Sequence, residues 1–144
     1  IQAAFELSNR WATKPDINQT VAISKPEEVF DELKGKARGK KKEFFWAVLL
    51  DTRNKMIKSV EISVGSLDAS IVHPRELFKE AISASASSII IAHNHPSGNP
   101  QASQDDIKLT KRLKECGDII GIEIVDHIIL GDERFLSMKR EGIF

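Results

Sequence analysis

Two histidines and two aspartates lie close together near the middle of the sequence. His93 and His95 flank Asn94, and a short segment rich in Pro, Gly, Asn and Ser leads from them to Asp105 and Asp106. In an extended backbone, residues two apart project to the same side, so both imidazoles can reach one ion. Catalytic zinc sites use three protein ligands, commonly imidazoles and carboxylates, plus a water. The pattern therefore indicates one zinc ion per chain.

The third ligand must be one of the two aspartates. Both begin a predicted helix, whose 3.6-residue period places them about 100° apart around the axis, so only one can point at the histidines. The spacing alone does not decide between them. Ser103 precedes them as a helix N-cap, and Asp106 would complete a capping box with it. A capping role and a ligand role can coexist at Asp106.

Two buried strands are predicted to frame this group of residues. Residues 88–92 form a short β-branched run that is typical of an inner strand and leads directly to His93. Residues 43–51 form a nearly continuous apolar run, which favours a strand buried on both faces. A half-buried antiparallel partner is expected at residues 56–64. The helix that begins after Ser103 should end just before Gly117.

The remaining periodic segments complete an alternating α/β pattern. Helices are predicted at residues 3–11, at 25–34 with Ser24 and Glu27 as a capping box, and from 74 to near 86. Closing strands are expected within residues 119–130 and 135–138.

Residues 34–42 form a basic stretch, with Lys or Arg at six of nine positions. Two glycines interrupt it, so it is predicted to be an exposed loop. Over the whole chain, 21 Lys and Arg balance 21 Asp and Glu, which argues against the strong basic character typical of nucleic-acid and membrane-surface proteins. Any DNA contact should therefore be weak and should come through Lys34–Lys42.

The composition is that of one ordinary folded domain. The 144 residues are 41% hydrophobic and 29% charged, and Cys116 is the only cysteine. One cysteine excludes an intrachain disulfide framework and a cysteine-rich zinc site, which favours a cytoplasmic setting. No apolar run approaches the roughly 20 residues of a membrane span. The chain opens with Ile1 rather than methionine, so a fragment of a longer protein is expected.

The segment from His93 to Asp106 resembles the JAMM signature, in which His-x-His-Pro is followed by six residues, Ser, two residues and Asp. This resemblance selects Asp106 as the third ligand. Val72–Glu76, His93–Gly98 and Asp126–Asp132 are also similar to segments of the bacterial RadC family.

The resemblance to the RadC family covers roughly residues 20–144 and implies a fold. The expected architecture is a three-layer α/β/α sandwich around a mixed sheet, the JAMM or MPN domain, which is related to zinc deaminases. The expected division is a lead-in helix and linker at 1–20 and this domain at 21–144.

The resemblance also implies catalytic roles. A glutamate near the start of the first core strand acts as general base in JAMM enzymes, and Glu43 occupies that place. Ser103 would donate a hydrogen bond to the developing oxyanion. Glu76 and Glu61 remain rival bases. His73 and His127 are interpreted as structural residues.

The leading functional hypothesis is a zinc-dependent hydrolase of a peptide or isopeptide bond, with a peptide or protein as substrate. The alternatives are a DNA-repair-associated module and a scaffold whose zinc site is not primarily catalytic. Asn94 stands where the eukaryotic JAMM peptidases usually have serine or threonine, which leaves the ligands unchanged but leaves the substrate class open.

Overall fold

The computed structural model describes residues 22–65 and 72–144, so the helix predicted at 3–11 lies outside the described residues. A mixed sheet of five strands forms the middle of the fold, in the order β2-β1-β3-β4-β5. Its strands are β1 (Glu43–Leu50), β2 (Met56–Gly65), β3 (Ser88–Asn94), β4 (Glu123–Leu130) and β5 (Phe135–Ser137). The pair β3 and β4 is parallel, and the other neighbours are antiparallel.

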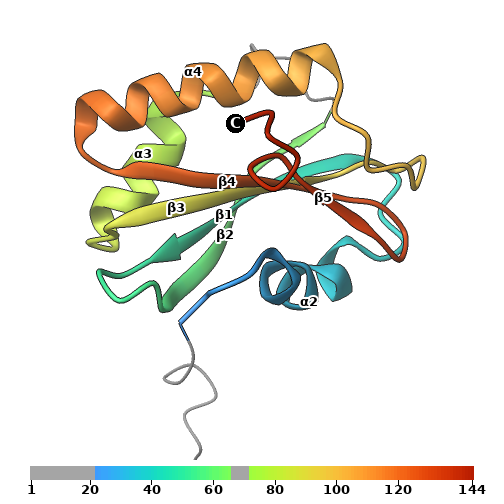
Figure 1. Ribbon diagram of the computed structural model, residues 1–144, viewed down its shortest axis with the longest axis horizontal. Coiled ribbons are helices and arrows are strands. Elements are labelled where there is room, and N and C mark those ends of the chain that lie inside the picture. The colour runs from blue at the N-terminus through green and yellow to red at the C-terminus, as the bar shows by residue number, and fades with distance from the viewer. Residues whose placement is uncertain (1–21, 66–71) are drawn as a thin grey trace, which may run out of the picture.

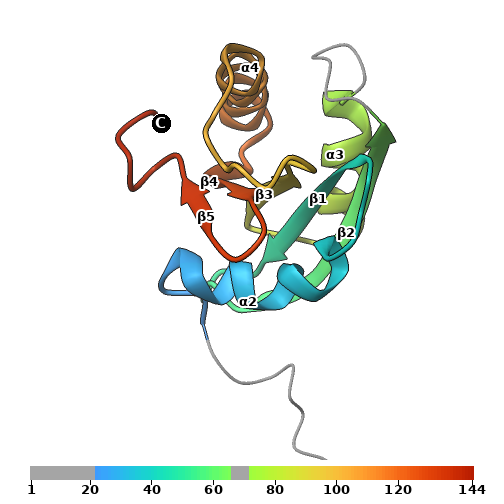
Figure 2. The ribbon, with the colours of Figure 1, turned by 90° about the vertical axis from the view of Figure 1, so that its right-hand side faces the viewer.

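Helices cover both faces of this sheet. They are α2 (Pro26–Ala37), α3 (Pro74–Ser83) and α4 (Gln104–Ile120). Figure 1 shows α4 and α3 on one face and α2 on the other, and the perpendicular view in Figure 2 shows the same three layers. The sheet and the two helical layers confirm the predicted α/β class and the mixed sheet.

The continuous apolar run of β1 is explained by two cores, one on each face of the sheet. Phe45, Ala47 and Leu49 pack into the core beneath α3 and α4. The alternating residues Trp46 and Val48 pack into the core beneath α2. Because successive side chains of a strand point to opposite faces, a strand buried on both sides carries apolar residues at consecutive positions.

The helix α4 is longer than the sequence predicted. It continues past Gly117 to Ile120, and Gly121 ends it in the left-handed conformation at φ 86°. Gly117 is instead needed for packing, because a Cβ there would lie 2.5 Å from the carbonyl oxygen of Ile122. The closing strand therefore starts at Glu123 rather than near residue 119.

The basic stretch was predicted entirely as a loop, but its first part is helical. The helix α2 runs through Lys34 and Lys36 to Ala37, where Lys34 pairs with Asp31 and Lys36 donates to Ser59. The expected capping box is also wrong by one residue. The acid that accepts hydrogen bonds from the backbone at the start of α2 is Glu28.

Two smaller boundaries complete the comparison. The helix α3 ends at Ser83 instead of near residue 86. Within residues 22–65 and 72–144, every helix is too short or too polar to cross a membrane.

Candidate metal centre

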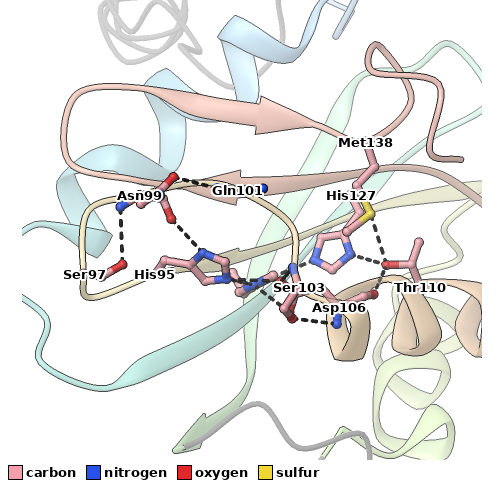
Figure 3. A network of polar contacts seen from close by, with 10 residues as sticks. His95, Ser97, Asn99, Gln101, Ser103, Asp106, Thr110, His127 and Met138 are labelled. Atoms are coloured by element: carbon pink, nitrogen blue, oxygen red, sulfur yellow. Dashed lines mark hydrogen bonds and ion pairs between the residues drawn. The ribbon is translucent and has the colours of Figure 1, made fainter.

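The two histidines and Asp106 come from adjacent parts of the fold. His93 lies at the end of β3, in the row of side chains that faces α4, and His95 follows it where the chain leaves the sheet. Asp106 lies in the first turn of α4, directly over this strand end (Figure 3). Asp105 is exposed in the same turn. Among the described residues the structure thus brings together His93, His95 and Asp106, the three residues that the sequence proposed as metal ligands.

The side-chain atoms of this triad form a small triangle. The two Nε2 atoms of His93 and His95 lie 2.9 Å apart. One Asp106 oxygen lies 3.2 Å from His93 Nε2, and the other lies 3.2 Å from His95 Nε2. Ligands around a tetrahedral zinc, at about 2.0–2.1 Å from the metal, are separated by roughly 3.3 Å. The triangle therefore fits one small ion after shifts of a few tenths of an ångström.

Hydrogen bonding at His95 determines which of its nitrogens can bind a metal. His95 Nδ1 lies 2.8 Å from the backbone carbonyl oxygen of Asn99. A carbonyl can only accept, so Nδ1 carries the hydrogen and donates it. In the neutral ring, Nε2 is then left with its lone pair, which points at the triangle.

A chain of buried hydrogen bonds determines which nitrogen of His93 keeps its lone pair. The Thr110 hydroxyl donates to the carbonyl oxygen of Asp106 at 2.7 Å, so its oxygen accepts from His127 Nδ1 at 2.5 Å. His127 Nε2 then carries a lone pair and accepts from His93 Nδ1 at 2.7 Å. His93 Nε2 is left as an acceptor, like His95 Nε2.

Three acceptors therefore converge on one point: two imidazole lone pairs and a carboxylate. Their mutual repulsion is relieved by a cation or by a proton on one of the rings. Two imidazoles and one carboxylate are a typical ligand set for zinc and for other first-row transition metals. The chemistry of these residues, and not only their proximity, therefore suits a metal ion.

The predicted base Glu43 lies at the start of β1, next to this triad. Its side chain is on the same sheet face as that of Phe45, two residues on, which pairs with His93. The pKa of His95 is raised, first by its hydrogen bond with Asp106 and further by the charge of Glu43. Glu43 is thus close enough to influence the triad electrostatically.

The two rival acids are placed differently. Glu61 pairs with Trp46, whose side chain packs beneath α2, so Glu61 lies on the face opposite the triad. Glu76 is exposed in the first turn of α3.

Ser103 takes the N-cap position predicted for it. Its hydroxyl oxygen accepts from the backbone N–H of Asp106 at 3.1 Å, and Asp106 accepts from the backbone N–H of Ser103 at 2.9 Å. This capping box fixes the Asp106 carboxylate in place. The Ser103 hydroxyl hydrogen is not needed for the cap and can be donated elsewhere.

Comparison with known proteins agrees with this geometry. The model of the RadC-like JAB domain family matches residues 23–143, which span all three triad residues. The chain belongs to this family. Curated relatives include UPF0758 proteins of Desulforudis audaxviator, 48% identical over the whole chain, and of Geobacillus sp., 50% identical over 99% of it. The chain spans 62% of the length of each of these relatives.

In the RadC-like JAB domain, the loop of residues 95–98 packs closely against the turn that follows β4. The backbone N–H of His95 donates to the carbonyl oxygen of Leu130 at the end of β4. The carbonyl oxygen of Gly98 accepts a hydrogen bond from the backbone N–H of Asp132. A Cβ on Gly98 would lie 2.5 Å from an Asp132 oxygen, and its φ of 86° also favours glycine. The glycine of the His-Pro-Ser-Gly segment thus lets this loop pack against the turn between β4 and β5.

The residues His127 and Thr110 were not recognised as part of the site from the sequence. His127 is fully buried and lies on β4, the parallel neighbour of the strand that carries His93. A signal was present: Thr110 is four residues after Asp106, and residues at this spacing share a helix face. These two residues orient the ring of His93, and with it the Nε2 atom that faces Asp106, in the RadC-like JAB domain.

Removing the Thr110 hydroxyl should weaken metal binding. The variant Thr110→Val keeps the shape but removes the acceptor for His127, so His127 and His93 lose their fixed tautomers. Changes to such supporting partners typically cost about 10–100-fold in metal affinity. Zinc affinity measured by chelator competition checks this, with Ser88→Ala as a control at the other end of β3. An unchanged affinity in Thr110→Val would contradict the tautomer chain.

Metal affinity should also depend on pH. Burial lowers the pKa of His93, whereas the hydrogen bond with Asp106 raises the pKa of His95 above 6.5 in the metal-free protein. Burial acts to raise the pKa of Asp106, but hydrogen bonds with both histidines hold it well below its usual range. Asp106 thus stays ionised, and the proton that competes with the metal is the one on His95.

The direction of this pH dependence follows from competition between the proton and the metal for His95. A proton on His95 is bound tightly below its raised pKa and must leave before the metal binds. Affinity should therefore fall about tenfold for each pH unit below that pKa and level off above it. Chelator competition between pH 5 and pH 8 measures this, and a flat profile across that range would contradict it.

Proposed function

We propose that this chain is a zinc-dependent hydrolase of the JAMM type, which cleaves a peptide or isopeptide bond. The convergence of three acceptor atoms from His93, His95 and Asp106 carries the proposal. Each neutral imidazole donates its single N–H hydrogen, on Nδ1, to a partner outside this group. Membership of the RadC-like JAB family supports it, since some JAB domains are hydrolases.

Zinc bound at this site would polarise a substrate carbonyl and acidify a water molecule. Glu43, on the triad face at the start of β1, would accept the proton from the attacking water and later return it to the leaving amine. The Ser103 hydroxyl, whose oxygen already accepts from Asp106, would donate its hydrogen to the developing oxyanion. Both residues act within the space beside the triad.

A substrate can approach the triad from the side of His95. The side chain of His93 is fully buried, whereas that of His95 keeps 15% of its surface exposed. A cavity of about 590 Å³ lies beside His95 and Pro96. Its lining includes the cationic residues Arg38, Lys40 and Lys41 and the acidic residues Asp132 and Glu133.

A cleavage screen tests the proposal. The zinc-loaded chain is incubated with a library of peptides and of lysine-linked isopeptides, and the products are identified by mass spectrometry. Hydrolysis should require zinc, disappear with chelator and be absent in His95→Ala. A fully metallated chain that cleaves none of these substrates would favour the scaffold or the DNA-associated function instead.

The DNA association remains a prediction. The cationic residues predicted for it are divided between the end of α2 and the following loop. Two of them, Lys34 and Lys36, already contact Asp31 and Ser59.

A further inference from the structure

The side chain of Asn94 occupies the place where the pairing between β1 and β3 ends. The backbone pairing of these strands reaches Phe45 and His93 and goes no further. Beyond it, the Asn94 carboxamide takes over: Phe44 donates its N–H to Oδ1 at 2.6 Å, and Nδ2 donates to the Lys42 carbonyl at 3.0 Å. The two bonded backbone groups lie on either side of Glu43.

We propose that Asn94 is a positioning residue that holds Glu43 beside the metal centre, an inference that rests on the proposed function. On its other edge, the backbone at Glu43 pairs with Gly65 of β2. With Asn94 on the β3 side, residues 42–44 are bonded along both edges instead of one. The start of a strand bonded on only one edge frays readily, so this second edge limits the movement of Glu43.

Asparagine is suited to this place for a chemical reason. Its carboxamide offers an acceptor and a donor side by side, which matches a carbonyl and an N–H on the same strand edge. Aspartate keeps only the acceptor, and alanine offers neither group. Asn94 is 3% exposed, so water cannot easily replace a hydrogen bond that a substitution removes. The backbone group left without its partner then destabilises this part of the strand.

The expected consequence is catalytic. A general base must lie within hydrogen-bond reach of the proton it removes, and a displacement of about 1 Å can cost roughly 100-fold in rate. Asn94 contacts the backbone around Glu43 and not the triad atoms, so its removal should disturb the base while the metal ligands stay in place.

Backbone amide exchange, measured by NMR, tests the contact itself. In Asn94→Ala, exchange at Phe44 should accelerate by about tenfold, as expected for one lost hydrogen bond, while Val48 in the middle of β1 stays protected. In Asn94→Asp, the acceptor remains and Phe44 should stay protected. The control Ser88→Ala, which removes a buried hydroxyl from the same strand, should leave Phe44 unchanged. Unchanged exchange at Phe44 in Asn94→Ala would overturn the proposal.

Cobalt substitution tests the link to Glu43. The visible absorption of cobalt-loaded protein is measured as a function of pH. The pH at the midpoint of the spectral change reports the loss of a proton from water at the metal. A nearby carboxylate opposes loss of a proton, so Glu43→Gln should lower the midpoint by about one pH unit. Asn94→Ala should lower it by part of that amount, and the double variant should match Glu43→Gln alone.

The possible results distinguish a failure of the positioning role of Asn94 from a failure of the proposed metal-dependent function. A wild-type chain that takes up no cobalt overturns both. A midpoint that moves in Glu43→Gln but not in Asn94→Ala overturns only the positioning role, as do additive shifts in the double variant. Equal midpoints in the double variant and Glu43→Gln, together with fast exchange at Phe44, support it.

Discussion

Purified protein should contain about one zinc ion per chain, and Asp106→Asn should lose most of it. The triad supplies the three protein ligands that a tetrahedral site with one water requires. Replacing one ligand should weaken binding by more than the roughly 10–100-fold expected when only a supporting residue is changed. Elemental analysis for zinc and iron measures the content, because two histidines and a carboxylate can also hold ferrous iron.

The neighbouring aspartate provides a matched control. Asp105→Asn changes the same residue type in the same helical turn, but Asp105 is exposed and does not belong to the triad. Its zinc content should equal that of the wild type. Equal zinc in the wild type and in a His93 and His95 double alanine variant would show that the metal is bound elsewhere, and iron in place of zinc would change the proposed chemistry.

Replacement of Glu43 by glutamine should abolish most of the hydrolytic activity while zinc is retained. The substitution keeps the size of the side chain and removes its basicity, and Glu43 is not one of the three ligand residues. General-base catalysis typically contributes about 10²–10⁴-fold, so kcat should fall by at least about two orders of magnitude. The measurement is the rate of cleavage of a substrate found in the screen, together with zinc content and thermal unfolding.

Glu61→Gln is the control for this variant. Glu61 lies on the adjacent strand β2 but on the sheet face turned toward α2, so the same chemical change there should leave the rate unaltered. Full activity in Glu43→Gln with a large loss in Glu76→Gln would assign the base to Glu76 and leave the hydrolase function intact. Full activity in both variants would indicate a mechanism without a glutamate base.

Local patterns in the sequence were sufficient to predict most of the elements. The apolar runs of β1 and β3 identified two inner strands, because strands buried on both faces are apolar along most of their length. The helix boundaries were less well predicted. In the sequence, Gly117 indicates the end of the helix because glycine often follows a helix, whereas in the structure it lets Ile122 pack closely. A glycine that makes room for a neighbour looks the same in sequence as one that ends a helix.

The sequence by itself identified the candidate ligand residues, because the spacing in His93-Asn94-His95 and the JAMM-like distance to Asp106 are local properties. Only the tertiary structure decided how these residues are oriented. His127 and Asn94 act through contacts with His93 and with the backbone around Glu43, which are 34 and about 50 residues away in the chain. Such contacts exist only after β1, β3 and β4 have paired, because side-chain hydrogen bonds depend on distances of a few tenths of an ångström that no spacing along the chain encodes.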